Sequence, residues 1–327
     1  MLPVRDAETT LGDALTSVRQ QTFEDFECLI VDDGSQDRSA EIARAVSRED
    51  QRFGLLRNAS PGLVQALNLG LERAQGRWVA RLDADDRMHP ERLSMQLRAL
   101  VEHPSWLGTG CHVELFPRGR LGKGRLQYER WLNSMFTAND VRRERFVECP
   151  LAHPTWLFRR DLLVEYRYRD FSGPEDYDLM LRVLGAGHDV GVVPHKLLAW
   201  RDHPTRLSRV NPRYDIERFV ELKAAHLASE YLDRDRRYVL VGYGKTGKKL
   251  AKELRRRGYH PSHIVEVHVG RIGQRIAGVP VVGLGELAHL EARRSIVSVA
   301  GLEARTRLRA LLHQMGMKEE RDFVCAA

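Results

Sequence analysis

The 327-residue sequence lacks several features that would place it in familiar classes. No apolar run approaches the roughly 20 residues that a helix needs to cross a bilayer. The N-terminus shows no charged segment followed by an apolar stretch and a small-residue cleavage site, so we expect no export signal. The four cysteines have no CxxC spacing, which argues against a zinc ribbon or a disulfide framework and fits a reducing cytoplasm. Fixed-period repeats and low-complexity segments are also missing.

What is present is enough apolar sequence for two α/β domains, each with its own core, since 43% of the residues are hydrophobic. The net charge of +7 comes from arginines interspersed with acids. The densest basic run, Arg255 to Arg257, lies at a predicted helix end, where cations are favoured anyway. We therefore expect no nucleic-acid partner. Basic surface fits phosphorylated substrates or an anionic membrane face equally well, so peripheral association with the inner face of the membrane stays open, as does a homo-oligomer.

Carboxylates follow a short apolar strand in the stretch 78–86, WVARLDADD. A strand of β-formers and small residues is normally buried, so its end is where charged side chains first meet solvent and ligands. Because side chains alternate along an extended backbone, Asp83 and Asp85 are predicted to point to the same side. Two hard oxygen ligands without thiol or imidazole between them suit Mg²⁺ or Mn²⁺ better than zinc. The residues by themselves equally allow an acidic loop that starts the helix near Pro90.

Strands and helices alternate along the first half of the sequence. Apolar patterning predicts strands at 26–31 and 54–57 and helices at 10–18 and 35–45, with a further helix ending at Ala74. The strand at 26–31 ends in Asp32-Asp33-Gly34-Ser35, which places carboxylates at the carboxyl edge of a parallel sheet. Open α/β folds bind their ligands at this edge.

Several motifs in this order resemble family 2 glycosyltransferases of the GT-A fold. They are PVRD at 3–6, QQTF at 20–23, VDDGSQD at 31–37, NLGL at 68–71, AQG at 74–76 and LDADD at 82–86. The resemblance extends to about Ser208 and implies a mixed, mainly parallel GT-A sheet flanked by helices. It departs at the start, where the family has a complete apolar strand before Pro3. We expect either that translation begins upstream of Met1 or that the edge of the nucleotide pocket is incomplete.

The resemblance implies a donor site for a nucleoside diphosphate sugar. Pro3, Arg5 and Asp33 are expected against its base and ribose, because a carboxylate can accept from an imide N–H or from ribose hydroxyls. Asp32 is instead expected to cap the glycine turn that follows it. Arg57 is expected to approach the phosphates, although an exposed surface arginine is an equally good interpretation.

The resemblance also implies a metal site beside the donor phosphates. Asp83 is expected near ribose and metal, and Asp85 is expected to be the more direct metal ligand. The segment 198–208 resembles the family's closing segment, in which a histidine completes the metal site or contacts phosphate, so His203 is a further candidate. Arg201 or Arg206 would neutralise the leaving group. The alternative for His203 is ordinary polar surface.

A general base is expected at the start of the helix that follows Gly173-Pro174. In the family, the matching Glu-Asp pair opens the helix beneath the acceptor site, and its aspartate is the base. The resemblance therefore implies Asp176 as base, with Glu175 binding acceptor hydroxyls or sharing that role. Acids in the first helical turn also have a purely structural explanation, since they complement the helix dipole. His153 and Trp156 are expected on the acceptor side, in contact with sugar, although Trp156 is better explained as core.

A second, Rossmann-like α/β domain is predicted after the charged stretch 232–237, so the predicted division is 1–231, linker 232–237 and 238–327. Strand 238–241 runs into a GxGxxG pattern formed by Gly242, Gly244 and Gly247, and Glu266 lies where a ribose-binding acid belongs. Lys249 stands where a P-loop needs a hydroxyl, so an NTPase is rejected. No substrate domain follows, which leaves NAD or a similar nucleotide and a purely structural or oligomerising role as equal alternatives.

These observations and the resemblance together predict a metal-dependent glycosyltransferase, and the resemblance implies inversion at the anomeric carbon. The expected donor is a UDP-sugar, and the expected acceptor is a hydroxyl of a glycan or of a lipid-linked molecule in the cytoplasm. The alternative is a non-catalytic sensor of nucleotide sugars. The presence of Asp176 together with Asp85 favours the enzyme, because a sensor needs no base.

Overall fold

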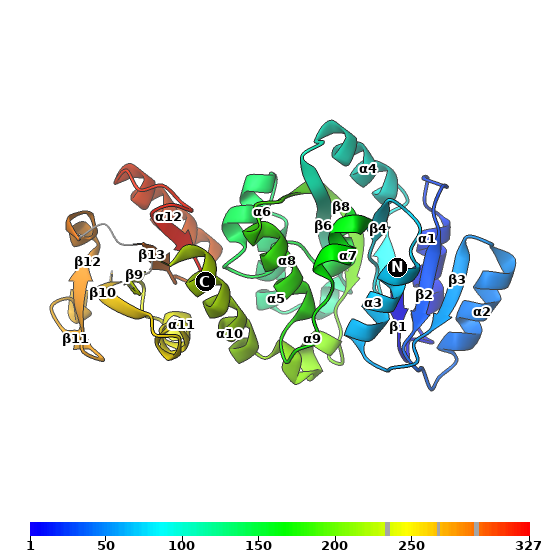
Figure 1. The fold of residues 1–327 in the computed structure, drawn as a ribbon, viewed down its shortest axis with the longest axis horizontal. Coiled ribbons are helices and arrows are strands. Elements are labelled where there is room, and N and C mark those ends of the chain that lie inside the picture. The colour runs from blue at the N-terminus through cyan, green and yellow to red at the C-terminus, as the bar shows by residue number, and fades with distance from the viewer. Residues whose placement is uncertain (233–235, 267–268, 291–293) are drawn as a thin grey trace. The chain divides into compact units, whose positions relative to one another are not determined.

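The computed structural model describes residues 1–232, 236–266, 269–290 and 294–327 (Figure 1). Its contacts divide the chain into two compact units. The first unit comprises Met1–Arg142, Pro150–Phe171 and Glu175–Val210, and the second comprises Arg143–Cys149, Ser172–Pro174 and Asn211–Ala327. Each unit is an α/β structure and is described in turn.

The first unit begins with a small parallel sheet in the order β1-β2-β3. Its elements are β1 (Leu2–Val4), α1 (Leu11–Arg19), β2 (Cys28–Asp32), α2 (Ser39–Glu49), β3 (Phe53–Arg57) and α3 (Leu63–Arg73). Helix α2 begins four residues later than predicted. The Asp37 carboxylate accepts a hydrogen bond from the backbone N–H of Ser39 at 2.9 Å, and this side-chain contact marks the helix start.

A five-stranded mixed sheet in the order β4-β7-β6-β8-β5 completes the first unit. Its strands are β4 (Trp78–Ala80), β5 (Arg87–Met88), β6 (Trp106–Phe116), β7 (Leu157–Arg159) and β8 (Asp189–Arg201). Strands β6 and β8 run parallel, whereas β4 and β6 both pair antiparallel with β7. The helices are α4 (Arg92–Glu102), α5 (Lys123–Leu132), α6 (Ala138–Glu144), α7 (Arg160–Tyr166), α8 (Glu175–Gly185) and α9 (Leu207–Val210), with 3-10 turns η1 (Arg118–Arg120) and η2 (His153–Thr155).

The second unit is built on a sheet in the order β11-β12-β10-β9-β13-β14. Its elements are η3 (Pro212–Tyr214), α10 (Ile216–His226), η4 (Leu227–Tyr231), β9 (Arg237–Val241), α11 (Lys245–Arg256), β10 (His260–Glu266), η5 (Val269–Arg271), β11 (Arg275–Ile276), β12 (Val279–Gly283), η6 (Leu284–His289), β13 (Ser295–Val297), α12 (Leu302–Gln314) and β14 (Phe323–Cys325). All neighbouring strands pair in parallel except β11 with β12. The strand order reverses beside β9, as in doubly wound nucleotide-binding sheets.

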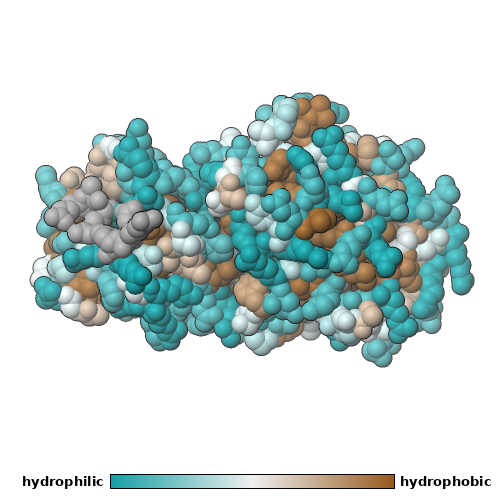
Figure 2. Space-filling view, in the orientation of Figure 1, coloured by the Kyte–Doolittle hydropathy of each residue, from teal (hydrophilic) through white to brown (hydrophobic). Residues whose placement is uncertain are grey.

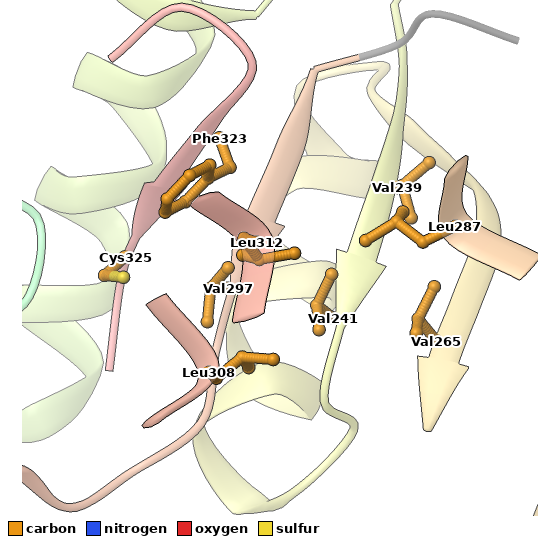
Figure 3. Packing of buried hydrophobic residues seen from close by; sticks show 9 residues of the cluster. All are labelled: Val239, Val241, Val265, Leu287, Val297, Leu308, Leu312, Phe323 and Cys325. Atoms are coloured by element: carbon orange, nitrogen blue, oxygen red, sulfur yellow. The ribbon is translucent and has the colours of Figure 1, made fainter. Parts of the chain in front are cut away.

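Apolar side chains from β9, β10, β13, β14, η6 and α12 form the core of the second unit (Figure 3). The sticks in Figure 3 are Val239, Val241, Val265, Leu287, Val297, Leu308, Leu312, Phe323 and Cys325. Short runs of Val and Ile that are buried on both faces are typical of parallel strands. The core therefore explains why strand β9, predicted at 238–241, could be recognised from its apolar run.

The division between the units differs from the predicted boundary at residue 231. Residues 211–231, predicted to belong to the first domain, lie in the second unit, together with the segment Arg143–Cys149. Within that unit the buried Glu144 carboxylate pairs with Arg305 at 3.2 Å and with Arg309 at 2.8 Å. Half of the predicted linker 232–237, namely residues 233–235, lies outside the described residues. Independent folding of 238–327 stays a prediction.

The surface shown in Figure 2 is largely hydrophilic, with small apolar areas between charged side chains. Among the residues that the structure describes, no helix combines the length and the apolar character that spanning a membrane requires.

Candidate active site

Three carboxylates converge in the turn that follows β4. The backbone N–H of Asp86 donates to the carbonyl of Asp83 at 3.2 Å. Carboxylate oxygens of Asp83, Asp85 and Asp86, together called the carboxylate cluster, lie within 4.8 Å of one another. The strand ends at Ala80, so a turn, and not the alternation of an extended backbone, brings Asp83 and Asp85 together. This turn also adds Asp86, which the sequence analysis did not single out.

The electrostatics of the carboxylate cluster favour a divalent cation. Burial, and then the charge of Asp83, raises the pKa of Asp85. Asp86 is fully buried, and burial together with the charges of Asp83 and Asp85 raises its pKa well above the usual range. Its Oδ1 accepts from the backbone N–H of Arg201 at 2.7 Å, whereas Oδ2 has no hydrogen-bond partner among the described residues. Hard oxygen donors that burial and mutual repulsion disfavour as anions fit Mg²⁺ or Mn²⁺, whose charge would relieve that repulsion.

Residues after β8 surround the carboxylate cluster. His203 Nε2 lies 3.0 Å from Asp85 Oδ2, so the histidine predicted for the metal site does reach that aspartate. Arg201 donates through Nε to the backbone carbonyl of Asp85 at 2.8 Å, which makes it a support of the turn. Its expected contact with the donor stays a prediction. Arg206 lowers the pKa of both Asp85 and Asp86, so its charge acts on the cluster.

Arg81 is a candidate that sequence reasoning missed. Its buried side chain forms an ion pair with Asp83. Its Nε has no hydrogen-bond partner among the described residues. The sequence does carry a signal, because a charged residue between an apolar strand and Leu82 is costly to bury unless it has a partner or a function.

The expected donor residues follow three neighbouring strand ends. The register pairs Val4 with Asp32 and Asp32 with Arg57, so Arg5, Asp33 and Arg57 leave the sheet at one edge. Arg57 is exposed there. The structure therefore gathers these residues as the parallel-strand argument predicts.

Asp33 is held by contacts from the next loop. Its Oδ1 accepts from Asn58 Nδ2 at 2.6 Å and from the backbone N–H of Gly62 at 2.7 Å, while Arg5 Nη1 lies 3.9 Å from Oδ2. Pro3 is buried within β1. Asn58 was missed by sequence reasoning, because its contact with Asp33 joins residues 25 positions apart.

Asp32 accepts from the backbone N–H of Ser35 at 3.0 Å, which is the turn-capping contact expected of it. Gly34 has a backbone φ of +80°, a conformation that residues other than glycine rarely adopt. The turn therefore depends on both residues, and Asp33 is left as the carboxylate that faces Arg5.

The predicted base lies at the first turn of α8, within the electrostatic reach of the carboxylate cluster. Burial raises the pKa of Asp176, the backbone N–H of Tyr177 and the charge of Arg81 lower it, and Asp83 raises it. The influence of Arg81 and Asp83 shows that Asp176 lies near the carboxylate cluster. Glu175 is almost completely buried, so Asp176 is the more accessible carboxylate of the pair.

The two aromatic residues expected on the acceptor side lie inside the fold. Trp156 is buried and stacks on Phe158, as its interpretation as core predicts. His153 is also buried, with Nε2 2.7 Å from the Tyr168 hydroxyl, and burial lowers its pKa well below the usual range. The expectation that His153 touches sugar is therefore not supported, since its ring is enclosed by protein.

The glycine loop of the second unit has the local geometry of its sequence pattern. Gly242 has φ +89°, and a Cβ at Gly247 would lie 2.6 Å from the carbonyl oxygen of Gly242, so helix and strand meet closely there. A Cβ at Gly244 would have no neighbour within 4 Å, so the loop is open at that point. Glu266 accepts from the backbone N–H of Tyr243 at 3.0 Å. In this structure the predicted ribose acid therefore supports the loop.

The mixed sheet, flanked by helices and with carboxylates gathered beyond its strand ends, is that of an α/β fold of the GT-A type. Solved structures show the same fold. S. aureus TarS 1–349 in complex with UDP-GlcNAc has a TM-score of 0.57 at 16% identity, over 78% of this chain and 71% of TarS. The mannosyltransferase PcManGT of Pyrobaculum calidifontis, in complex with GDP-Man and Mn²⁺, has a TM-score of 0.50 at 16% identity, over 79% and 68%.

Sequence comparison identifies the family. The sequence model of the family called Glycosyl transferase family 2 matches residues 1–167, about half of the chain. The amylovoran biosynthesis glycosyltransferase AmsE of Erwinia amylovora is 31% identical over 201 residues, which cover 60% of this chain and 72% of AmsE. An uncharacterized glycosyltransferase of Haemophilus influenzae is 25% identical over 236 residues, covering 70% and 72%. The chain belongs to glycosyl transferase family 2 and is a glycosyltransferase.

Proposed function

We propose that this glycosyltransferase is metal-dependent and inverting, and that it moves a sugar from a UDP-sugar to a hydroxyl of a glycan or lipid-linked acceptor. The observation that carries the proposal is the convergence of the carboxylate cluster and His203 at a place whose charges act on Asp176. The ligands and names of similar proteins agree with this proposal. The TarS structure contains UDP-GlcNAc, that of PcManGT contains GDP-Man and Mn²⁺, and AmsE is named for amylovoran biosynthesis.

The residues divide the reaction between two sides of the sugar. On the donor side, Asp33 and Arg5 would hold the nucleoside, while Asp85 and Asp86 would hold the cation with His203 beside them. A bound divalent cation offsets the negative charge that develops on the departing diphosphate. On the acceptor side, Asp176 takes the proton of the attacking hydroxyl as that oxygen bonds to the anomeric carbon and the bond to the diphosphate breaks. A single displacement of this kind inverts the anomeric centre.

A panel of UDP-sugars and GDP-sugars, measured with and without Mn²⁺, tests the proposal. A donor bound only by the folded protein raises its unfolding temperature, so we expect one UDP-sugar to do so only when metal is present. Release of UDP in the presence of an acceptor would then report transfer. Stabilisation by none of the sugars would contradict the donor site. Stabilisation without turnover on any acceptor would favour a sensor.

We also propose that the glycine loop of the second unit binds a nucleotide such as NAD. Two features support this. The open space at Gly244 leaves room for a pyrophosphate, and the absence of a side chain at Gly247 lets the helix pack closely on the strand. Titration of the whole protein with NAD and NADP tests the proposal. Gly244→Val should abolish the binding, whereas Gly285→Val, at another open position of the same unit, should not. Wild-type protein that binds neither would favour a structural role.

A further inference from the structure

A group of arginines shares a single buried carboxylate in the first unit, close to the end of β8. Among the described residues, Asp202 is approached by Arg125 Nε at 3.0 Å, by Arg206 Nη1 at 3.9 Å and by Arg209 Nη2 at 2.8 Å. These three arginines, called the arginine cluster, come from α5, from the loop after β8 and from α9. Three guanidinium groups around one carboxylate leave a surplus of positive charge, because Asp202 neutralises only one of them.

The same place contains buried N–H donors that the described part of the chain leaves without acceptors. Arg125 Nη2 is shielded from solvent and has no hydrogen-bond partner there. The same holds for the indole Nε1 of Trp200, whose side chain is only 7% exposed. The guanidinium carbons of Arg125 and Arg206 lie 5.5 Å and 4.5 Å from the Trp200 ring centre. Buried donors normally have acceptors, so this orphan pair indicates a ligand that supplies them.

The electrostatics of the arginine cluster favour the binding of an anion. Burial, followed by the charge of Arg206, lowers the pKa of Arg125, so these neighbouring cations disfavour one another. Cations held side by side, and hydrogen-bond donors without acceptors, are both stabilised by a group with several anionic oxygens. A phosphate is such a group, and guanidinium forks match its geometry.

The arginine cluster also borders the carboxylate cluster. Arg206 is the arginine whose charge lowers the pKa of both Asp85 and Asp86. His203, which reaches Asp85, directly follows Asp202 in the chain. A phosphate bound by the arginines would therefore lie next to the cation site, although its partners, Arg125, Arg209 and Trp200, are not residues of that site.

Resting on the proposed transferase function, we propose that the arginine cluster and the Trp200 indole bind a phosphate group of a substrate. Two sources of that phosphate fit the chemistry. One is the diphosphate of the nucleotide donor, and the other is a phosphate that joins a lipid to the acceptor. Both offer the same anionic oxygens, so the experiment must separate them.

Calorimetric titration of the full chain with paired probes tests the proposal. UDP and farnesyl diphosphate carry the phosphates, and uridine and farnesol are their phosphate-free counterparts. Arg125→Gln removes one charged donor. It should lower the affinity for the phosphate-bearing probe about tenfold or more and leave the affinity for its phosphate-free counterpart unchanged. Loss for UDP identifies the donor diphosphate, and loss for farnesyl diphosphate identifies the acceptor phosphate. Arg130→Gln, an exposed arginine of the same helix, is the matched control and should change neither.

Further variants keep the outcome clear. Arg125→Lys retains the charge and should recover part of the lost affinity, whereas a purely structural role of the guanidinium would not produce a phosphate-specific loss. If Arg125→Gln does not fold, Arg209→Gln replaces it, since that side chain is 38% exposed. Unchanged affinity for both phosphate probes would overturn the site. Pyrophosphate binding to the wild type that is lost in the arginine variants would support the phosphate site even if no sugar donor were found. The phosphate site and the proposed function can therefore be contradicted independently.

Discussion

Acidic residues lie at strand ends in both units, yet the two places differ in how their charges are satisfied. In the first unit, the buried Asp86 keeps one oxygen without a hydrogen-bond partner among the described residues, and burial raises the pKa of Asp85 and Asp86. In the second unit, Glu266 accepts from the Tyr243 backbone N–H and pairs with Arg271 at 3.2 Å. In the first place, the proposed cation would balance the carboxylates, whereas in the second Glu266 is already balanced by protein.

The comparison shows why a sequence pattern alone does not establish a site. Both places follow the same rule, with an acid at the carboxyl end of a parallel or mixed sheet strand. Only the carboxylate cluster stores unfavourable charge that a ligand would relieve, and such unrelieved charge is typical of functional sites. The following predictions test this difference, beginning with the largest expected effect.

Asp176→Asn should lower the rate of sugar transfer by about a hundredfold or more, because the amide cannot accept the acceptor's proton. Binding of the nucleotide donor should be unchanged, since the carboxylate cluster is intact. Steady-state kinetics and a donor titration on the same preparation check both parts. Asp161→Asn, an exposed acid at the start of α7, is the control. Near-normal turnover of the Asp176 variant would remove this residue from the mechanism.

Arg81→Met should move the acid limb of the rate profile to higher pH. A base acts only when deprotonated, so activity falls as pH falls through the pKa of Asp176, which burial raises and the charge of Arg81 lowers. Without Arg81, that pKa rises further. The profile of kcat/KM against pH measures the shift, and Arg77→Met, an exposed arginine at the start of β4, should leave it in place. An unmoved limb would contradict the assigned role of Arg81.

Lys223 provides a test in the second unit, at a buried charge whose hydrogen-bond partners come from the protein itself. Its buried Nζ donates to the carbonyls of Val147 and Ala326, and burial lowers its pKa from 10.5 to about 8. Between these values the unfolded chain binds the proton and the folded protein does not. The unfolding free energy should therefore rise with pH across this interval, by up to about 1.4 kcal/mol per pH unit.

Denaturant unfolding at a series of pH values measures that slope. Lys223→Met should remove this contribution to the slope, while Lys252→Met, exposed on α11, should retain it. The same slope in the Lys223 variant and the wild type would show that another group titrates.

Much of the first unit was predictable because its motifs are local. The strand ends with Asp33 and Asp85, and the helix start with Asp176, follow from short patterns of apolar and acidic residues. Asp86 and Arg81 were missed because their importance comes from burial and from partners that the fold supplies. The limits of the second unit were missed for the same reason, since Glu144 belongs to it through Arg305 and Arg309, more than 150 positions away.

The most direct test of the central claim is calorimetric titration of UDP into the whole protein, with Mn²⁺ and with EDTA. We predict that UDP affinity falls about tenfold or more in EDTA, and equally in Asp85→Ala with Mn²⁺, with the unfolding temperature of the ligand-free protein not lowered. Glu102→Ala, an exposed acid at the end of α4, should bind UDP like the wild type. Equal UDP affinity with Mn²⁺ and with EDTA would contradict the assignment of the carboxylate cluster as a metal site.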